Sequence, residues 1–217
     1  PNDKTTVLGR AHDWAANLPF GQINPLATLA LGSLGALGDR EGIALTLGGG
    51  VVAIASNGGR FSHADGKGPV FGDFGGGFWI GQSAMRRAIA TLDGRDNTED
   101  LVDLMKNELT EYGTLQNTTG VEAAQLCIRA AKTVAMGSEQ GLSNAVKILE
   151  EGSQHLARTI ISGWSKVSHG EKLPSLTIQG GLSKSNFYVD LIKTEVSKSL
   201  SFDYVTGDGD HLIGAPR

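Results

Sequence analysis

The sequence has a single cysteine among its 217 residues, which excludes an internal disulfide framework and a cysteine-rich zinc site. It has no run of about 18 apolar residues, the length that a membrane-spanning helix requires, and its first residues lack the apolar core of a secretory signal. Basic residues are not in excess, because the formal net charge is -4. A nucleic-acid or anionic-lipid partner would call for a basic surface. We therefore expect a cytoplasmic protein that binds no nucleic acid and no membrane.

Several common catalytic patterns are also absent. The five histidines are scattered without the spacing of metal ligands, so we predict no metal site built from protein side chains. No serine lies in a G-x-S-x-G segment, and neither a Walker A loop nor a G-x-G-x-x-G fingerprint occurs. The tripeptide Asp73-Phe74-Gly75 spells the metal-binding motif of protein kinases, but the other kinase motifs do not precede it. We interpret that match as a coincidence.

Glycine, in contrast, is abundant. The chain has 31 glycines, about twice the average share of roughly 7%. Many of them lie between residues 32 and 81, whereas residues 82–170 are poor in glycine and rich in Ala, Leu, Glu and Lys. The change near Gly81 predicts β structure with tight turns before it and helices after it.

The glycine-rich part predicts a β-hairpin. Apolar β-formers over Ile43–Leu47 and Val51–Ile54 flank the turn Gly48-Gly49-Gly50, and a second turn follows at Asn57-Gly58-Gly59. We expect the first turn to expose consecutive backbone N–H groups at the end of a sheet. Near the C-terminus, "PSLTIQGGLSKSNFYVDLIKTEV" predicts a strand, a turn at Gly180-Gly181 and a helix, and such turns are where α/β proteins place phosphates.

The part between these segments is predicted to be helical. The 3.6-residue period predicts helices over residues 82–94, 98–113, 119–138 and 141–167. Cys127 falls in the third of these and is expected to be a small buried apolar residue. A strand-like "SFDYVTG" follows the last helix. The alternation of hairpin, helices, strand, helix and strand predicts an α/β domain with a partly parallel sheet.

The ordered motifs resemble one family. "GIALTLGGGVVAIASNGGRFSHADGKGPVFGDFGGGFWIG" is similar to the centre of the N-acetylglucosamine kinase and BadF/BadG/BcrA/BcrD ATPase family, a branch of the actin, Hsp70 and sugar-kinase superfamily. Members typically show G-T-G-S after a strand, then G-G-W-G-P, then G-D-E-G-S-G-x-W-I-G. "SLTIQGGLSKSNFYVDLI" resembles the adenosine motif of the family, and "DHLIGAPR" resembles its closing segment.

This resemblance implies a ribonuclease H-like actin/sugar-kinase fold, with a mixed sheet flanked by helices. Residues 43–217 would form the C-terminal ATPase/sugar-kinase domain, and residues 1–42 would be the remnant of an N-terminal lobe. Either the chain is catalytically impaired or the sequence is incomplete. The implied ATP-binding residues are Gly48, Gly49, Gly50, Gly180, Gly181 and Ser183. The implied substrate-binding residues are Gly72, Asp73 and Gly75. Asp73 is also the candidate for a catalytic carboxylate.

The implied activity is transfer of a phosphoryl group from ATP, with Mg²⁺, to a hydroxyl of an amino sugar of the N-acetylglucosamine or glucosamine type. The resemblance also implies a possible homodimer. Four departures from the family pattern bear on activity. Gly49 and Val51 stand where G-T-G-S has its threonine and its serine. Phe74 stands where a second acid is usual, and Asn24 stands where a catalytic base is expected. An amide cannot act as a general base.

Two alternatives therefore stay open. One is a binding protein that senses a nucleotide or a sugar without turning it over, which the departures at Gly49, Val51, Phe74 and Asn24 would suit. The other is an activator-type ATPase of the same family, which carries an iron–sulfur cluster shared between subunits. That cluster needs at least two cysteine ligands from each chain, and this chain offers only Cys127.

Overall fold

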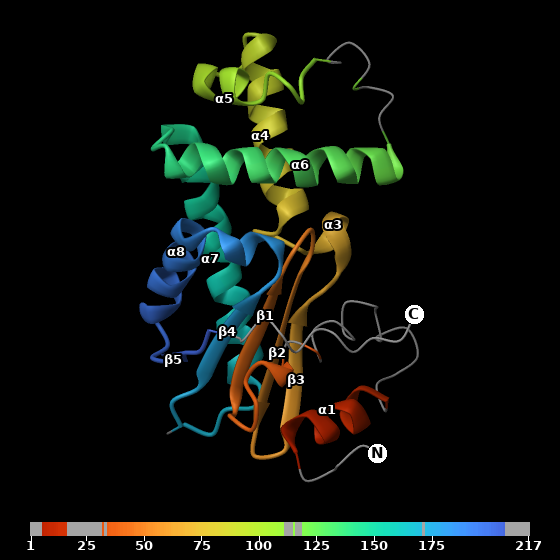
Figure 1. Cartoon of the computed structure of the whole chain (residues 1–217), viewed down its shortest axis with the longest axis vertical. Coiled ribbons are helices and arrows are strands. Elements are labelled where there is room, and N and C mark those ends of the chain that lie inside the picture. The colour runs from red at the N-terminus through yellow and green to blue at the C-terminus, as the bar shows by residue number, and fades with distance from the viewer. Residues whose placement is uncertain are drawn as a thin grey trace.

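A five-stranded mixed sheet forms the centre of the computed structural model, which describes residues 6–16, 32, 34–110, 115, 119–170 and 172–206 (Figure 1). The strands are β1 (Gly42–Leu47), β2 (Val51–Asn57), β3 (Arg60–Asp65), β4 (Ser175–Gln179) and β5 (Asp203–Tyr204). Their order is β3-β2-β1-β4-β5. β1, β2 and β3 pair antiparallel, whereas β4 runs parallel to both β1 and β5. The partly parallel sheet predicted from the sequence is confirmed.

β3 has no counterpart among the predicted strands. It begins directly after the turn at Gly58 and Gly59, because Asn57 pairs with Arg60 in the ladder between β2 and β3. The two glycines have φ values of 57° and 77°, which fit a two-residue type I′ hairpin turn. The predicted turn is therefore confirmed. The sequence pattern does not predict the strand that follows it, because several of its residues are polar.

Helices cover the sheet and extend past one end of it. They are α1 (Val7–Ala16), α3 (Gly68–Phe71), α4 (Gly77–Leu92), α5 (Glu99–Leu104), α6 (Gly120–Glu139), α7 (Ser143–Ser165) and α8 (Asn186–Ser197), and the 3₁₀ helix η2 (Gly181–Lys184) precedes α8. α7 packs across β1, β2 and β3, and α4, α5 and α6 lie beyond the end of the sheet (Figure 1). None of the helices in the described ranges is long and apolar enough to cross a membrane.

α4 begins at Gly77, earlier than the predicted start at Gln82. Glycine is a poor helix former, so sequence periodicity does not extend the helix into this region. The structure supplies the reason for the early start, because backbone carbonyls of the β1–β2 turn accept hydrogen bonds from the first N–H groups of the helix. Gly94 follows the end of α4 with a φ of 72°, as predicted for a residue that terminates a helix.

The predictions for the remaining helices differ in accuracy. α6 and α7 occupy nearly the predicted ranges, and Cys127 is buried in α6 as expected. The helix predicted over 98–113 is shorter, because α5 ends at Leu104 and turns follow it. Its predicted end at Gly113, the region around Asn24 and the closing segment 210–217 lie outside the described residues.

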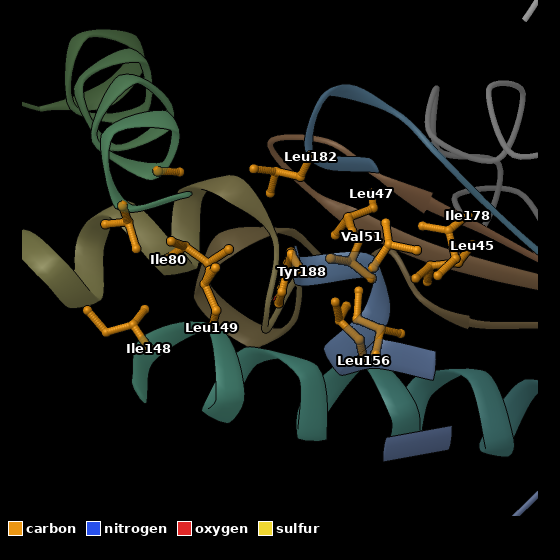
Figure 2. Close-up of a cluster of buried hydrophobic side chains, with 14 of the residues drawn as sticks. Leu45, Leu47, Val51, Ile80, Ile148, Leu149, Leu156, Ile178, Leu182 and Tyr188 are labelled. Carbon is orange, nitrogen blue, oxygen red and sulfur yellow. The ribbon is translucent and has the colours of Figure 1, made fainter. Parts of the chain in front are cut away.

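Apolar side chains fill both faces of the sheet. Leu45, Leu47 and Val51 lie on the face toward α7 and α8, where they are fully buried. Figure 2 shows Tyr188 of α8 within this cluster, between side chains of the sheet and of α4 and α7. On the opposite face Ala44 and Ile54 pack in a smaller cluster with residues of α1 and of the segment before β1. Full burial of each Leu, Val or Ile contributes about 1.5–3 kcal/mol, so the sheet is a rigid base for the turns at its end.

Candidate functional site

The two predicted glycine turns meet at one edge of the sheet. β1 and β4 are parallel neighbours with Thr46 opposite Gln179, so the turn Gly48–Gly50 and the turn at Gly180 leave adjacent strands at their carboxyl ends. Gly180 has a φ of 122°, and a Cβ there would lie 2.3 Å from the carbonyl oxygen of Leu47. Only glycine fits this close approach. Ligands of open α/β sheets bind outside the carboxyl ends of the strands, so this edge is the candidate site.

The turn between β1 and β2 keeps two backbone donors available. The N–H groups of Gly77 and Phe78 in α4 donate to the carbonyls of Gly48 and Gly49, over 2.8 Å and 2.9 Å. The N–H of Gly48 donates to the carbonyl of Gly50 over 3.0 Å. Within the described part of the chain, the N–H groups of Gly49 and Gly50 have no acceptor. Successive free N–H groups in a turn form a concave site for an anion.

The carboxylate of Asp73 contacts this turn. Its Oδ1 accepts a hydrogen bond from the N–H of Val51 over 3.1 Å, and a Cβ at Gly50 would lie 2.7 Å from its Oδ2. Only 4% of Asp73 is exposed. Burial raises the pKa of its carboxyl; the Val51 hydrogen bond opposes this, and the nearby Asp65 charge adds to it. The carboxylate is thus a buried support for the glycine turn, a contact that the sequence analysis does not foresee.

The other two predicted substrate-binding residues lie in the same loop, between β3 and α4. Gly72 is extended and buried, and its missing side chain leaves space for Asp65, whose Oδ1 would lie 2.3 Å from a Cβ at that position. Gly75 has a φ of 85°, and its carbonyl accepts a hydrogen bond from the hydroxyl of Tyr188 over 2.8 Å. Of these three residues, Asp73 contacts the Gly48–Gly50 turn, whereas Gly72 packs on Asp65 and Gly75 on α7 and Tyr188.

Tyr188 links this loop to the second glycine turn. It is fully buried in α8, and burial raises the pKa of its hydroxyl far above the ordinary value. The helix begins after Ser185, whose hydroxyl accepts from the N–H of Tyr188 and also lies 3.1 Å from Oε1 of Glu139 at the end of α6. In the sequence Tyr188 is only one apolar position on a helical face, so nothing there reveals its hydrogen bond to Gly75.

Ser183, the third predicted adenosine residue, makes a local contact. Its hydroxyl donates to the carbonyl of Gly180 over 2.8 Å, within the η2 turn. Gly181 is exposed and has no atom within 4 Å of the position of a Cβ. The face of Gly181 is therefore open, as an approaching ligand would require, and Ser183 stabilises the turn that presents it.

A side chain of α6 lies beside the first glycine turn. The Cδ1 of Ile128 would lie 2.8 Å from a Cβ at Gly49, and 36% of Ile128 is exposed. At the C-terminal end of the same helix, Glu139 accepts a hydrogen bond from Ser185, which precedes α8. The middle of α6 therefore lies beside the first glycine turn, and its end lies near the second. No motif in the sequence marks Ile128 as a neighbour of the turn.

Phe74 does not lie among polar groups. Its ring packs on His155 of α7 with 5.2 Å between ring centroids, and His155 packs edge-on against Trp79 at 5.5 Å. Phe74 is 42% exposed, and burial lowers the pKa of the His155 imidazole. This position offers an apolar surface in place of a second carboxylate. No group of three or more His, Cys, Asp or Glu side chains within the described ranges could hold a metal ion.

Comparison with known proteins places the chain in a family. The sequence model of the BadF/BadG/BcrA/BcrD ATPase family matches residues 28–206. The chain belongs to this family. The chain is similar to the N-acetylmuramic acid/N-acetylglucosamine kinase of Clostridium acetobutylicum. The identity is 25%, over 93% of this chain and 67% of the kinase.

Two solved structures share the fold of this family member. A candidate N-acetylglucosamine kinase from Chromobacterium violaceum aligns with a TM-score of 0.63 and 20% identity, over 93% of this chain and 67% of its own. A second candidate, from Porphyromonas gingivalis, aligns with a TM-score of 0.60 and 16% identity, over 83% and 62%. The predicted actin/sugar-kinase fold class is confirmed. The chain spans about two thirds of the length of these relatives.

Proposed function

We propose that this chain provides the nucleotide-binding part of a kinase that transfers a phosphoryl group from ATP to a hydroxyl of an amino sugar. The observation that carries the proposal is the pair of free N–H groups at Gly49 and Gly50 beside the open turn at Gly180-Gly181. The two turns follow parallel neighbouring strands, which suits one ligand with a phosphate end and a second polar end. The kinase name of the Clostridium acetobutylicum relative supports an amino sugar as acceptor.

In this proposal each turn has its own task. The N–H groups of Gly49 and Gly50 donate to the phosphate oxygens, and the backbone at Gly180 and Gly181 contacts the adenosine part, with Ser183 fixing that turn. Mg²⁺, when bound to the phosphates, would neutralise charge that develops during transfer. The described residues offer no cluster of three ligands for it, so the phosphates would be its main partners.

The sugar side of the site is proposed for the loop from Gly72 to Gly75. Asp73 contributes one carboxylate there, and a carboxylate accepts paired sugar hydroxyls well. One of its oxygens accepts from Val51 and the other packs on Gly50, so contact with a sugar would require the loop to open or the hydroxyl to approach the Oδ2 edge. We propose hydroxyl binding for Asp73 ahead of a role as general base.

The domain division is part of the same proposal. We propose residues 43–217 as the C-terminal ATPase/sugar-kinase domain and residues 1–42 as part of an N-terminal lobe. The contact of Ala11 in α1 with the far face of the sheet supports packing between the two segments. We also propose a cytoplasmic protein and a homodimer; the outer face of α6, where Val121 is 72% exposed and Met136 is 61% exposed, is a surface that a second copy could cover.

The test is sugar-dependent release of ADP by the full-length protein. Glucosamine, N-acetylglucosamine, N-acetylmuramic acid and glucose are compared as acceptors, and binding of a non-hydrolysable ATP analogue is measured by calorimetry. ADP release only with an amino sugar supports the proposal. Binding of the analogue without turnover favours the sensor alternative, and no binding refutes both. Asp73→Asn with unchanged KM for the sugar would remove Asp73 from the substrate site.

A further inference from the structure

Two aspartates near the glycine turn have an unusual backbone conformation: one ends β3, and the other lies in the loop between β3 and α4. Asp65, with a φ of 67°, and Asp73, with a φ of 60°, are the two residues other than glycine with a positive φ in the described ranges. Aspartate tolerates this region better than most residues, but it is strained there compared with glycine. Strained residues persist where the surrounding structure determines them, and they cluster at functional sites.

The two aspartates are joined by a hydrogen bond. The N–H of Asp73 donates to Oδ1 of Asp65 over 2.9 Å. Asp65 reaches this N–H across Gly72, since its Oδ1 lies 2.3 Å from the place that a Cβ at Gly72 would occupy. A side chain at Gly72 would collide with the carboxylate of Asp65. The hydrogen bond therefore depends on Gly72 as well as on Asp65. Asp65 is thereby the acceptor that fixes the backbone of Asp73.

Asp73 transmits this fixed position to the glycine turn. Its carboxylate accepts from the N–H of Val51 over 3.1 Å and contacts Gly50. Asp65 at the end of β3, Asp73 in the loop and the turn at the end of β1 thus form one continuous set of contacts. Burial raises the pKa of the Asp73 carboxyl, and the charge of Asp65 raises it further.

We propose that Asp65 is a positioning residue for the phosphate-binding turn: it orients Asp73, whose carboxylate holds the Gly48–Gly50 turn, where the N–H groups of Gly49 and Gly50 have no acceptor within the described residues. The inference rests on the proposed function, because it assigns Asp65 an effect on nucleotide affinity. The physical reason is preorganisation. A turn that already presents its donors loses less conformational freedom when the phosphates bind.

Two substitutions separate the acceptor from the backbone conformation. Asp65→Gly suits the left-handed backbone but removes the acceptor, whereas Asp65→Asn keeps a carbonyl oxygen and tolerates the same φ. Asp39→Gly is the matched control, because Asp39 is exposed and precedes β1 at the end of the strand away from the glycine turn. The full-length variants are titrated with a non-hydrolysable ATP analogue below their unfolding temperatures.

We expect Asp65→Gly to bind the analogue about tenfold more weakly, and Asp65→Asn and Asp39→Gly to bind it within about twofold of the wild type. Rescue by asparagine is the result that a general loss of structure would not give. Wild-type affinity in Asp65→Gly overturns the role of Asp65 while the proposed function stands. Absence of binding in the wild type refutes the proposed function, and with it the nucleotide role of Asp65.

A second measurement needs no variant and covers the case in which Asp65→Gly does not fold. Hydrogen exchange of the Asp73 amide is followed in the wild type with and without the ATP analogue. If Asp65 positions the turn through Asp73, occupancy of the turn slows exchange at this amide. Unchanged exchange at Asp73 in a protein saturated with the analogue overturns the inference.

Discussion

Replacing Gly50 with alanine tests the contact between the glycine turn and Asp73. An ideal Cβ at Gly50 would lie 2.7 Å from Oδ2 of Asp73 and 3.1 Å from its Cγ, which is closer than real Cβ atoms approach a carboxylate. The carboxylate must therefore move away from the turn, and the N–H of Val51 loses its acceptor. A buried hydrogen-bonding group that is left without its partner costs about 1–3 kcal/mol.

This cost predicts both a stability and an affinity change. In a domain of about 150–250 residues each kcal/mol lowers Tm by about 2–4 °C, so we expect Gly50→Ala to unfold about 2–12 °C below the wild type. The turn shifts with the carboxylate, and restoring it on binding should weaken affinity for a non-hydrolysable ATP analogue by about tenfold, which corresponds to about 1.4 kcal/mol. Calorimetric titration and a thermal melt measure the two effects.

Gly35→Ala is the matched control, because no atom lies within 4 Å of a Cβ at Gly35. It should retain both the wild-type Tm and the wild-type affinity. A Gly50→Ala protein with a lowered Tm but unchanged affinity would refute the assignment of phosphates to this turn. Unchanged values for both quantities would refute the contact between Asp73 and the turn.

Three further changes probe the surroundings of the turn. Tyr188→Phe leaves the buried carbonyl of Gly75 without its donor, so Tm should fall by the equivalent of about 1–3 kcal/mol, and an unchanged melt would count against this bond. Burial raises the pKa of the Asp73 carboxyl above 3.8, so the folded state holds a proton that the unfolded chain releases. The contribution of Asp73 to stability therefore decreases as pH rises from 3.8 through the pKa of the folded state. The Tm of the wild type relative to that of Asp73→Asn should fall over the same pH range. Ile128→Asp places a negative charge beside Gly49 and should weaken binding of the ATP analogue by about tenfold, whereas Ile128→Ala should not; equal affinities would remove α6 from the site.

Local turn chemistry makes much of the sheet predictable. Consecutive glycines after apolar β-formers predict the hairpin at Gly48–Gly50, and a Gly-Gly pair between a strand and a helix predicts the turn at Gly180. Both turns are confirmed where the structure describes them. That they meet depends on the parallel pairing of β1 with β4, which joins segments more than a hundred residues apart. No local sequence pattern predicts a pairing between segments so far apart in the chain. Only the family resemblance predicts that the two turns contribute to one site.

The supporting contacts are less accessible from the sequence because they join residues of different elements. The hydrogen bond from Tyr188 to Gly75 spans helix and loop, and its residues carry no shared spacing. The start of α4 at Gly77 is similar: its first N–H groups are satisfied by the carbonyls of the β1–β2 turn, so tertiary contacts outweigh the low helix propensity of glycine. In both cases the sequence predicts that a helix is present but not the residues that it contacts.

The packing of the loop also limits where sugar contacts can come from. Asp73 is the one carboxylate of the segment 68–81, and one of its oxygens is already taken by Val51. Phe74 follows it with a ring that lies on His155, so this neighbour can offer a sugar an apolar surface and no acceptor. If the protein binds an amino sugar with several hydroxyl groups, further acceptors must therefore come from residues outside this loop. Phe74→Glu tests this. If acceptors outside the loop bind the sugar, the variant binds it no more tightly than the wild type, whereas a higher sugar affinity would show that the missing acceptor belongs at position 74.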